Sequence, residues 1–89
     1  MLTIDVSFVT SEDDLHGLLK RELDLPYFYG RNWDAFWDAV TGLVRIPDHV
    51  RFVGWALLVE HEPSGGRTLR RLLDDYRDQY RPDLLVEYV

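Results

Sequence analysis

Apolar and polar residues alternate at both ends of the chain, which predicts strands there. In the opening segment LTIDVSFV (residues 2–9), the apolar side chains recur at every second position: Leu2, Ile4, Val6 and Phe8. That alternation is typical of a half-buried strand. The segments HVRFVGW (49–55) and DLLVEYV (83–89) predict two more strands. One face of the sheet should contact water, because polar residues hold its alternate positions: Thr3, Asp5 and Glu87.

Between the strands, apolar residues recur at helical spacing. The segment SEDDLHGLLKREL (11–23) predicts a helix with Ser11 at its N-cap and acidic residues in its first turn. A second helix is predicted from Trp33 to Val44, with Asn32 as its N-cap. ALLVEHE (56–62) predicts a short helix, which the turn PSGG closes. The next segment, RTLRRLLDDYRDQY, predicts a long helix with one apolar stripe: Leu69, Leu72, Leu73, Tyr76 and Tyr80.

The order of these elements predicts the fold. Strands that alternate with helices indicate parallel crossover connections. Right-handed crossovers on one face of a sheet must step in the same direction, which gives the strand order 1-2-3. We therefore expect one domain over residues 1–89, a two-layer α/β fold in which a three-stranded parallel sheet carries its helices on one face. With 46% apolar residues, the chain can bury a single core.

Composition restricts the compartment and the chemistry. The chain has no cysteine, which excludes disulfides and Cys-ligated zinc. Its start, MLTIDVSFVT, lacks the basic and apolar regions of a secretion signal. Its apolar stretches are far shorter than the ~20 residues that span a bilayer. We expect a cytoplasmic protein with no membrane partner.

The formal net charge of −6 is unevenly distributed along the chain. Residues 1–48 hold nine acidic and four basic side chains, a net charge of −5, whereas residues 49–89 hold seven and six, a net charge of −1. An acidic surface repels nucleic-acid phosphates and attracts basic partners. Charge alone, however, is more typical of a small protein that is simply kept soluble.

The helix predicted at 33–44 has three distinct arcs at about 100° per residue. One arc is apolar: Trp33, Phe36, Val40, Leu43 and Val44. The opposite arc is polar: Asp34, Asp38 and Thr41. A flat strip of small residues lies beside the carboxylates: Ala35, Ala39 and Gly42. Trp37 falls at the border, so its ring can contact the core while one edge faces outward.

Asp34 and Asp38 lie one turn apart, and such a like-charge pair costs a helix roughly 0.2–0.5 kcal/mol. The helix dipole offsets this repulsion for Asp34, in the first turn, but not for Asp38. An uncompensated carboxylate beside Trp37 and a flat strip forms a site that cations of another molecule can approach closely. On spacing alone, the simpler interpretation of a solvated Asp38 and a core Trp37 is favoured.

Enzymatic chemistry has little support in the sequence. His16, His49 and His61 do not stand at metal-ligand spacing. The SGG segment lacks the strand, further glycines and lysine of a phosphate-binding loop, and serine nucleophile motifs are absent. Two aspartates on successive turns of one helix cannot flank a glycosidic bond from opposite sides. We expect no catalytic residue, no metal, no cofactor and no small-molecule substrate.

Residues 11–42, SEDDLHGLLKRELDLPYFYGRNWDAFWDAVTG, strongly resemble the barstar family of intracellular inhibitors of a secreted bacterial ribonuclease. The shared residues run in order and without gaps: D-L-H, L-K, E-L, L-P, Y-G, N, D-A, W-D-A and T-G. The rest of the chain follows the family more loosely, in total length and in the order of its elements.

In that family, the loop before the second helix and the exposed face of this helix plug the ribonuclease active site. The resemblance implies that Asp38 occupies the phosphate pocket and that Asp34 adds a second charge. It implies further contacts along the loop and the helix: Phe28, Tyr29, Gly30, Asn32, Trp33, Trp37, Thr41 and Gly42. It also implies an acidic contact on the last helix, placed at Asp75, with Asp74 left open.

Several positions depart from the family pattern. Phe28 stands in place of a tyrosine, Trp33 in place of a leucine and Leu43 in place of a tryptophan. Arg45 reverses a negative charge, and Asp75 is one methylene shorter than the usual glutamate. These departures bear on which enzyme is bound more than on how it is bound.

Three functions remain open at this point. The resemblance favours an inhibitor that forms a 1:1 complex with a basic, extracellular-type ribonuclease and replaces the substrate phosphate with carboxylates. The departures at Phe28, Trp33 and Arg45 permit a barstar-like module for a different basic protein. A nucleic-acid binder could use the exposed aromatic rings as stacking platforms, but the chain lacks a basic groove, so we expect no direct nucleic-acid binding.

Overall fold

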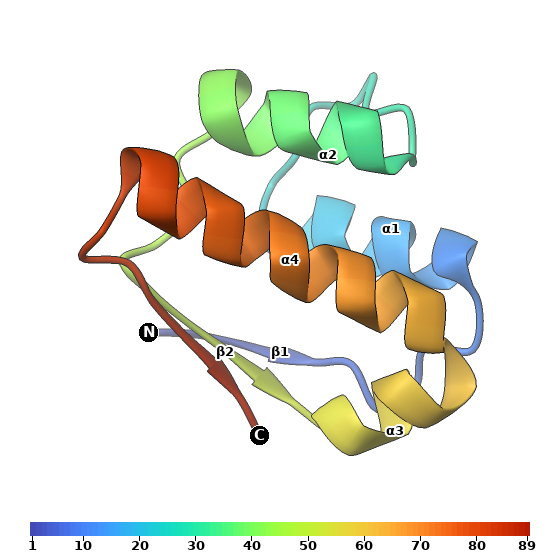
Figure 1. Cartoon of the computed structure of the whole chain (residues 1–89). Helices are drawn as coiled ribbons and strands as arrows, with labels where there is room; N and C mark the ends of the chain where they lie inside the picture. Colours follow the sequence, from blue (N-terminus) through green and yellow to red (C-terminus); the bar gives the residue numbers. More distant parts are fainter.

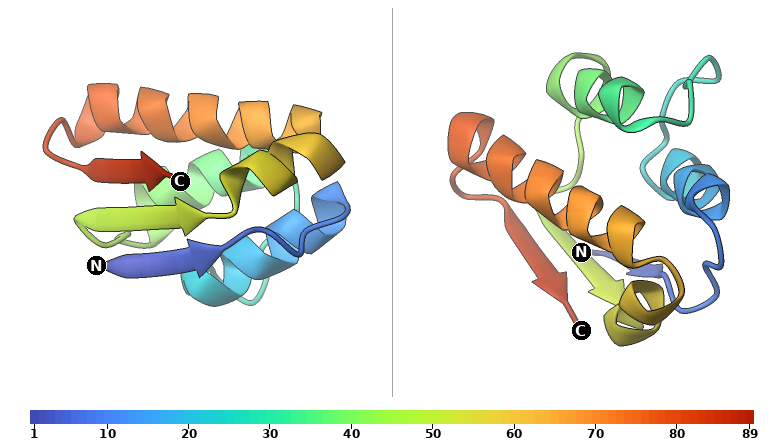
Figure 2. Two further views of the ribbon diagram at one scale, coloured as in Figure 1. Left: turned by 90° about the horizontal axis from the view of Figure 1, so that it is seen from below. Right: turned by 45° about the vertical axis from the view of Figure 1, so that its right-hand side comes forward.

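A computed structural model describes all residues, 1–89, and places three strands in one parallel sheet. The strands β1 (Leu2–Asp5) and β3 (Leu85–Tyr88) both pair with the central strand β2 (His49–Val53). Figure 2 shows the three arrows side by side and pointing the same way. The predicted α/β class and strand order 1-2-3 are confirmed.

Four helices connect the strands. The first connection holds α1 (Glu12–Glu22) and α2 (Trp33–Asp38), and the second holds α3 (Trp55–His61) and α4 (Pro63–Tyr80). In Figure 1, α1 and α4 lie over one side of the sheet, and α2 lies beyond α4, farther from the strands. This arrangement leaves one side of α2 on the outside of the molecule. None of the helices is both long and apolar enough to cross a membrane.

Strand alternation separates a buried face of the sheet from an open one. Ile4, Val50 and Phe52 are at most 2% exposed and form the floor of the core beneath the helices. Thr3 and Asp5 point to the other side and are exposed, as the sequence predicts. Burial contributes about 1.5–3 kcal/mol for each large apolar side chain, which holds the helical layer on the sheet.

The first strand is shorter than the alternation predicts. It ends at Asp5, whose carboxylate accepts hydrogen bonds from the backbone N–H (2.9 Å) and the hydroxyl (2.6 Å) of Ser7. These bonds hold the pKa of the Asp5 carboxyl below its ordinary value and turn the chain away from the sheet. Phe8, which the alternation places in the core, is 82% exposed. The prediction of a strand through residue 9 was therefore wrong.

The second helix begins as predicted, but it changes from an α-helix to a π-helix after Asp38. Asn32 is the N-cap, and its side-chain oxygen accepts a hydrogen bond from the N–H of Ala35 at 2.7 Å. Residues Ala39–Leu43 form a π-helical turn, which the N–H of Val44 closes by donating to the carbonyl of Ala39 at 3.0 Å. The wider turn rotates the following side chains. Leu43, predicted on the apolar arc, is 56% exposed, whereas Ala39, predicted on the flat strip, is 1% exposed.

The last helix begins earlier than predicted. The segment PSGG, interpreted from sequence as a turn, forms its first residues, with Pro63 at the start and the Glu62 side chain accepting from the N–H of Gly65 at 3.3 Å. A Cβ at position 65 would lie 2.9 Å from Cγ of Glu62 and 3.3 Å from Cδ2 of Leu15, so glycine here allows α4 to approach α1 closely. The proline is tolerated because the first turn of a helix has no use for its missing N–H.

Candidate functional site

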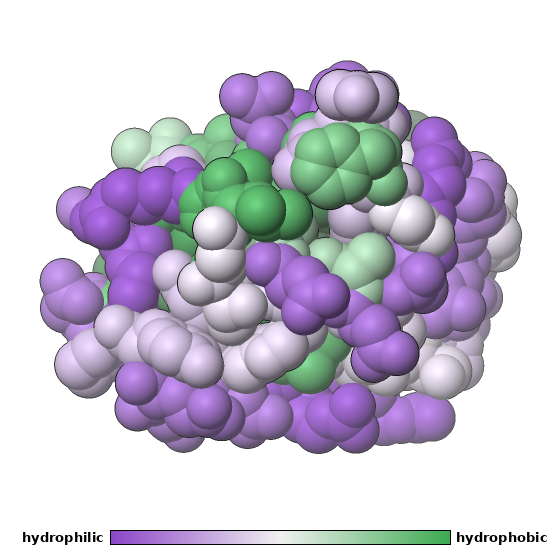
Figure 3. Space-filling model, turned by 90° about the horizontal axis from the view of Figure 1, so that it is seen from above, coloured by the Kyte–Doolittle hydropathy of each residue, from purple (hydrophilic) through white to green (hydrophobic).

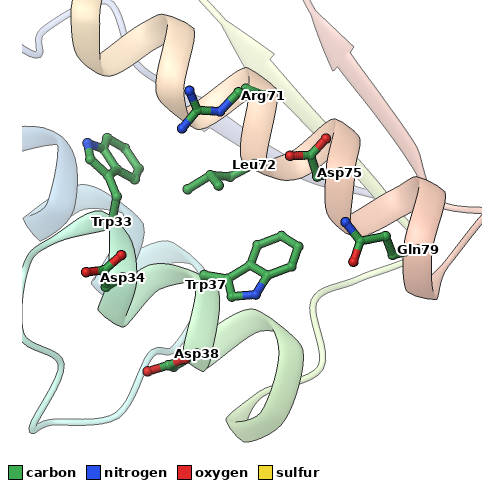
Figure 4. Close-up of a pocket in the computed structure, with 8 residues that line it drawn as sticks. All are labelled: Trp33, Asp34, Trp37, Asp38, Arg71, Leu72, Asp75 and Gln79. Carbon is green, nitrogen blue, oxygen red and sulfur yellow. The ribbon is translucent and has the colours of Figure 1, made fainter.

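The exposed side of α2 and the neighbouring side of α4 form one groove of ≈430 Å³. Figure 4 shows the side chains that line it. Helix α2 contributes four predicted site residues: Trp33, Asp34, Trp37 and Asp38. Helix α4 contributes Arg71, Leu72, Asp75 and Gln79. The fold thus brings the carboxylates of α2 together with Asp75, from the other end of the chain.

Three carboxylates of this groove form neither a hydrogen bond nor an ion pair within the chain: Asp34, Asp38 and Asp75. All three are exposed. Asp74, the alternative to Asp75 on the last helix, instead pairs with Arg77 at 3.6 Å and does not line the groove. Free carboxylates gathered around one concave surface create a local negative potential.

Both tryptophans of α2 are fixed by aromatic neighbours and only partly exposed. The ring of Trp33 lies 4.3 Å from the ring of His16, and its indole N–H donates to the carboxylate of Glu12. The ring of Trp37 lies 6.2 Å from the ring of Tyr80 and extends into the groove between the two helices. The carboxylates therefore border rigid aromatic surface.

A second hollow, of ≈300 Å³, lies on the other side of Asp38. It is more apolar than the groove, and its walls come from the loop and from α2 and its π-helical turn: Pro26, Phe28, Tyr29, Gly30, Ala35, Asp38, Ala39 and Leu43. Phe28 and Leu43 are 63% and 56% exposed, so apolar surface is open to solvent here. Figure 3, viewed from the α2 side, shows green apolar patches among purple hydrophilic residues. Asp38 stands at the border of both depressions.

The loop that carries Phe28 rests on a buried pair of polar rings. Tyr29 is 8% exposed, and its hydroxyl lies 2.5 Å from Nδ1 of His16, which is 1% exposed on α1. Burial lowers the pKa of His16, and the carboxylates of Glu12 and Asp13 only partly oppose this effect. Burial also raises the pKa of the Tyr29 phenol. Both side chains are thus held neutral beneath the loop.

Arg31 continues the loop in the left-handed backbone region, with φ of 51°. Its guanidinium pairs with the carboxylate of Asp13 at 3.1 Å, which ties the loop to α1. The amide of Asn32 donates to the carbonyl of Gly30 at 3.2 Å while the same side chain caps α2. Left-handed backbone at a non-glycine residue is uncommon and is held here by contacts on both sides.

The predicted contact face of α2 ends in the π-helical turn with Thr41, whose hydroxyl is used within the helix, and Gly42, which is open to solvent. The hydroxyl of Thr41 donates to the carbonyl of Trp37 at 2.6 Å, so it is used within the helix. Gly42 is exposed, and a Cβ there would meet no atom within 4 Å. Neither here nor elsewhere in the chain is a group of three or more His, Asp or Glu side chains arranged to hold a metal ion.

Comparison with known proteins decides the family. Residues 1–88 match the family described as "Barstar (barnase inhibitor)". The chain belongs to the barstar family. A curated protein of Bacillus subtilis (strain 168), named "Putative ribonuclease inhibitor YrdF", is 58% identical over 33 residues. That match covers 37% of this chain and 36% of the relative, so it spans about a third of either protein.

Barstar-family proteins are inhibitors and not enzymes, which confirms the prediction that this chain has no catalytic function. Sequence reasoning gave no site role to several residues that line or support the candidate site, and three of them matter most: Leu43, His16 and Arg71. Leu43 was assigned to the core, because the π-helical turn has no recognisable signal in sequence. His16 was considered only as a metal ligand and rejected, although it supports the loop before α2. Arg71 received no role, because its place in the groove depends on how α4 packs against α2.

Proposed function

We propose that this barstar-family protein inhibits a basic, extracellular-type ribonuclease by plugging its active site in a 1:1 complex. The observation that carries the proposal is the set of three unpaired carboxylates around one groove: Asp34, Asp38 and Asp75. A ribonuclease collects cationic side chains around the scissile phosphate, so its active site is a positive, concave surface. Carboxylates held on rigid helices can take the place of that phosphate.

The unpaired state of these carboxylates supports this function. A carboxylate already paired within the chain would have to lose that partner before it could bind a cation of the enzyme. Asp38 needs no such exchange, and its position between the groove and the apolar hollow makes it the central acceptor. Hydrogen bonds between arginine and carboxylate are charge-assisted and can be bidentate, which gives them both strength and orientation.

The surrounding surface supplies contact area and excludes water. Phe28 and Leu43 expose apolar surface beside Asp38, and Trp33 and Trp37 line the groove on its other side. Rigid aromatic side chains around a charged contact are typical of the residues that dominate binding at protein interfaces. Tyr29 is buried and holds the loop in place, so we assign it a positioning role at this interface.

Direct binding of nucleic acid is not favoured at the same face. Single strands bind where aromatic rings alternate with basic side chains that contact the phosphates. Here the partly exposed rings of Trp33 and Trp37 stand beside carboxylates, which repel a phosphate backbone.

The inhibitor would act in the cytoplasm, where it protects the producing cell from a ribonuclease before secretion.

The experiment is a pull-down of purified secreted microbial ribonucleases with the immobilised chain, followed by titration of each captured enzyme against RNA cleavage. We expect capture of at least one basic ribonuclease and complete loss of its activity at one equivalent of the chain. Capture without inhibition would contradict active-site plugging. Failure to capture any ribonuclease would contradict the proposal and favour the alternative of a barstar-like module for a different basic protein.

A further inference from the structure

Arg71 is the only basic residue among the eight that line the groove. It is exposed and forms no ion pair within the chain. Figure 4 shows its guanidinium extending toward the Trp33 end of the groove, while the carboxylate of Asp75 lies one turn further along α4. A positive charge thus stands inside a face whose proposed partner is positive.

A bound enzyme would remove water from Arg71 as well as from the carboxylates. A charged group that loses water without gaining a partner is strongly unfavourable. Asp74 and Asp75 stand three and four residues further along the same helix, but neither pairs with Arg71: Asp74 pairs with Arg77 at 3.6 Å, and Asp75 forms no ion pair. If Arg71 formed an ion pair with Asp75 on binding, the inhibitor would have only two of its three carboxylates left to bind the cations of the enzyme. The acceptor for Arg71 must therefore come from the partner.

The surface beyond Arg71 is positive as well. Arg67 and Arg70 lie on the same helix, and neither forms an ion pair. The guanidinium of Arg70 lies 4.3 Å above the ring of Tyr88, where a cation–π contact orients it. A polar hollow of ≈710 Å³ opens between these side chains: Ser64, Arg67, Thr68, Arg70, Arg71, Asp74 and Asp75. Arg71 borders both this hollow and the carboxylate groove.

We infer that the bound ribonuclease presents a carboxylate to Arg71, next to the cations that face Asp34, Asp38 and Asp75. This inference rests on the proposed function and specifies the partner, which must be bipolar: a basic active site with an acidic group on the rim that faces α4. Charges of both signs on one face fix the orientation of docking and exclude enzymes whose rim is basic at that point.

The test compares charge reversals on one helix. The first variant is Arg71→Glu, and the matched control is Arg67→Glu, one turn earlier, which changes the charge equally but does not line the carboxylate groove. Arg71→Gln removes the charge without reversing it. Each variant is titrated against the ribonuclease captured by the wild-type chain, and thermal melting verifies that each is folded.

We expect Arg71→Glu to weaken binding by about tenfold to a hundredfold, because a charged hydrogen bond is lost, with Arg71→Gln in between and Arg67→Glu within about threefold of wild type. If Arg71 instead faces solvent or a cation, Arg71→Glu will bind equally or more tightly, which overturns the inference. Equal weakening by Arg71→Glu and Arg67→Glu also overturns it. Failure of the proposed function is recognised separately, because the wild-type chain would then capture no ribonuclease or would capture one without inhibiting it.

Discussion

The hydroxyl of Tyr29 and Nδ1 of His16 lie 2.5 Å apart, and this contact joins the loop before α2 to α1. Both side chains are at most 8% exposed. The other ring nitrogen of His16, Nε2, has no hydrogen-bond partner, and the ring packs against Trp33 at 4.3 Å. The loop before α2 is therefore supported from beneath by a buried polar pair.

Stability should fall in mildly acidic solution because of His16. Burial lowers its pKa in the folded protein below the ordinary value of 6.5, with Glu12 and Asp13 opposing and Arg31 adding to the effect. The unfolded chain then binds the proton more readily. The stabilising effect of neutral His16 is fully present above the unfolded pKa and is lost as the pH falls below it toward the folded pKa.

Two measurements check this expectation. An NMR titration of the His16 ring should give a pKa below 6.5. Thermal melts of the wild type from about pH 8 to about pH 5 should show a steeper decrease in melting temperature than those of His16→Gln, which keeps a polar group but cannot titrate. Parallel curves for the two proteins, or a ring pKa at or above the ordinary value, would contradict the account.

Gly54 is required by the backbone at the end of β2. Its φ is +76°, and a Cβ there would lie 2.5 Å from Cβ of Ser7. We expect Gly54→Ala to lower the free energy of unfolding by about 2–4 kcal/mol, because it adds both backbone strain and a steric clash. Urea denaturation measures the loss. A stability equal to that of the wild type would show that the chain can shift here without cost.

Gly42→Ala is the matched substitution with the opposite expectation. The added methyl meets no atom within 4 Å, so stability should be unchanged or slightly higher. Because Gly42 belongs to the proposed contact face, the same methyl should hinder a closely docked enzyme and weaken inhibition. Melting and inhibition are measured on the same preparation. Unchanged inhibition would remove Gly42 from the interface without affecting the fold.

Much of the fold could be predicted from the sequence, because its signals are local. Ser11 and Asn32 cap their helices as their residue types suggest, with hydrogen bonds to the N–H groups of Asp14 and Ala35. Strand alternation and chain order are sufficient for a parallel 1-2-3 sheet. The polar arc of α2 also followed from spacing, although its function came only from the resemblance to the barstar family.

The remaining features depend on tertiary packing, which spacing does not determine. The π-helical turn at Ala39–Leu43 uses ordinary helix residues, so a regular winding placed Leu43 in the core. The choice between Asp74 and Asp75 depends on which carboxylate pairs with Arg77. Arg71 joins the groove only because α2 crosses that part of α4.

Electrostatic attraction should accelerate association. The chain has a net charge of −6, and its unpaired carboxylates gather on the face that would meet the basic enzyme. Long-range attraction between such surfaces is screened as the Debye length shortens with salt. We expect the association rate, measured by stopped-flow fluorescence, to fall by about tenfold or more between low and high ionic strength. A rate independent of salt would remove steering from the account.

The central claim is that the carboxylate of Asp38 takes the place of the substrate phosphate. Asp38→Ala and Asp38→Asn change an exposed side chain with no partner in the chain, so the melting temperature should stay nearly constant. Asp83→Asn is the control, since it removes one exposed carboxylate that does not line either depression.

The deciding measurement is the titration of the captured ribonuclease with these three variants. Asp38→Asn keeps the shape of the side chain and removes its charge, so it separates charge from fit. We expect Asp38→Ala and Asp38→Asn to weaken inhibition by similar factors, about tenfold to a thousandfold, because enzyme cations would lose water without gaining a charged acceptor. Asp83→Asn should stay within about threefold of wild type. Full inhibition by Asp38→Ala would contradict the assigned site, and near-normal inhibition by Asp38→Asn alone would contradict phosphate replacement by charge.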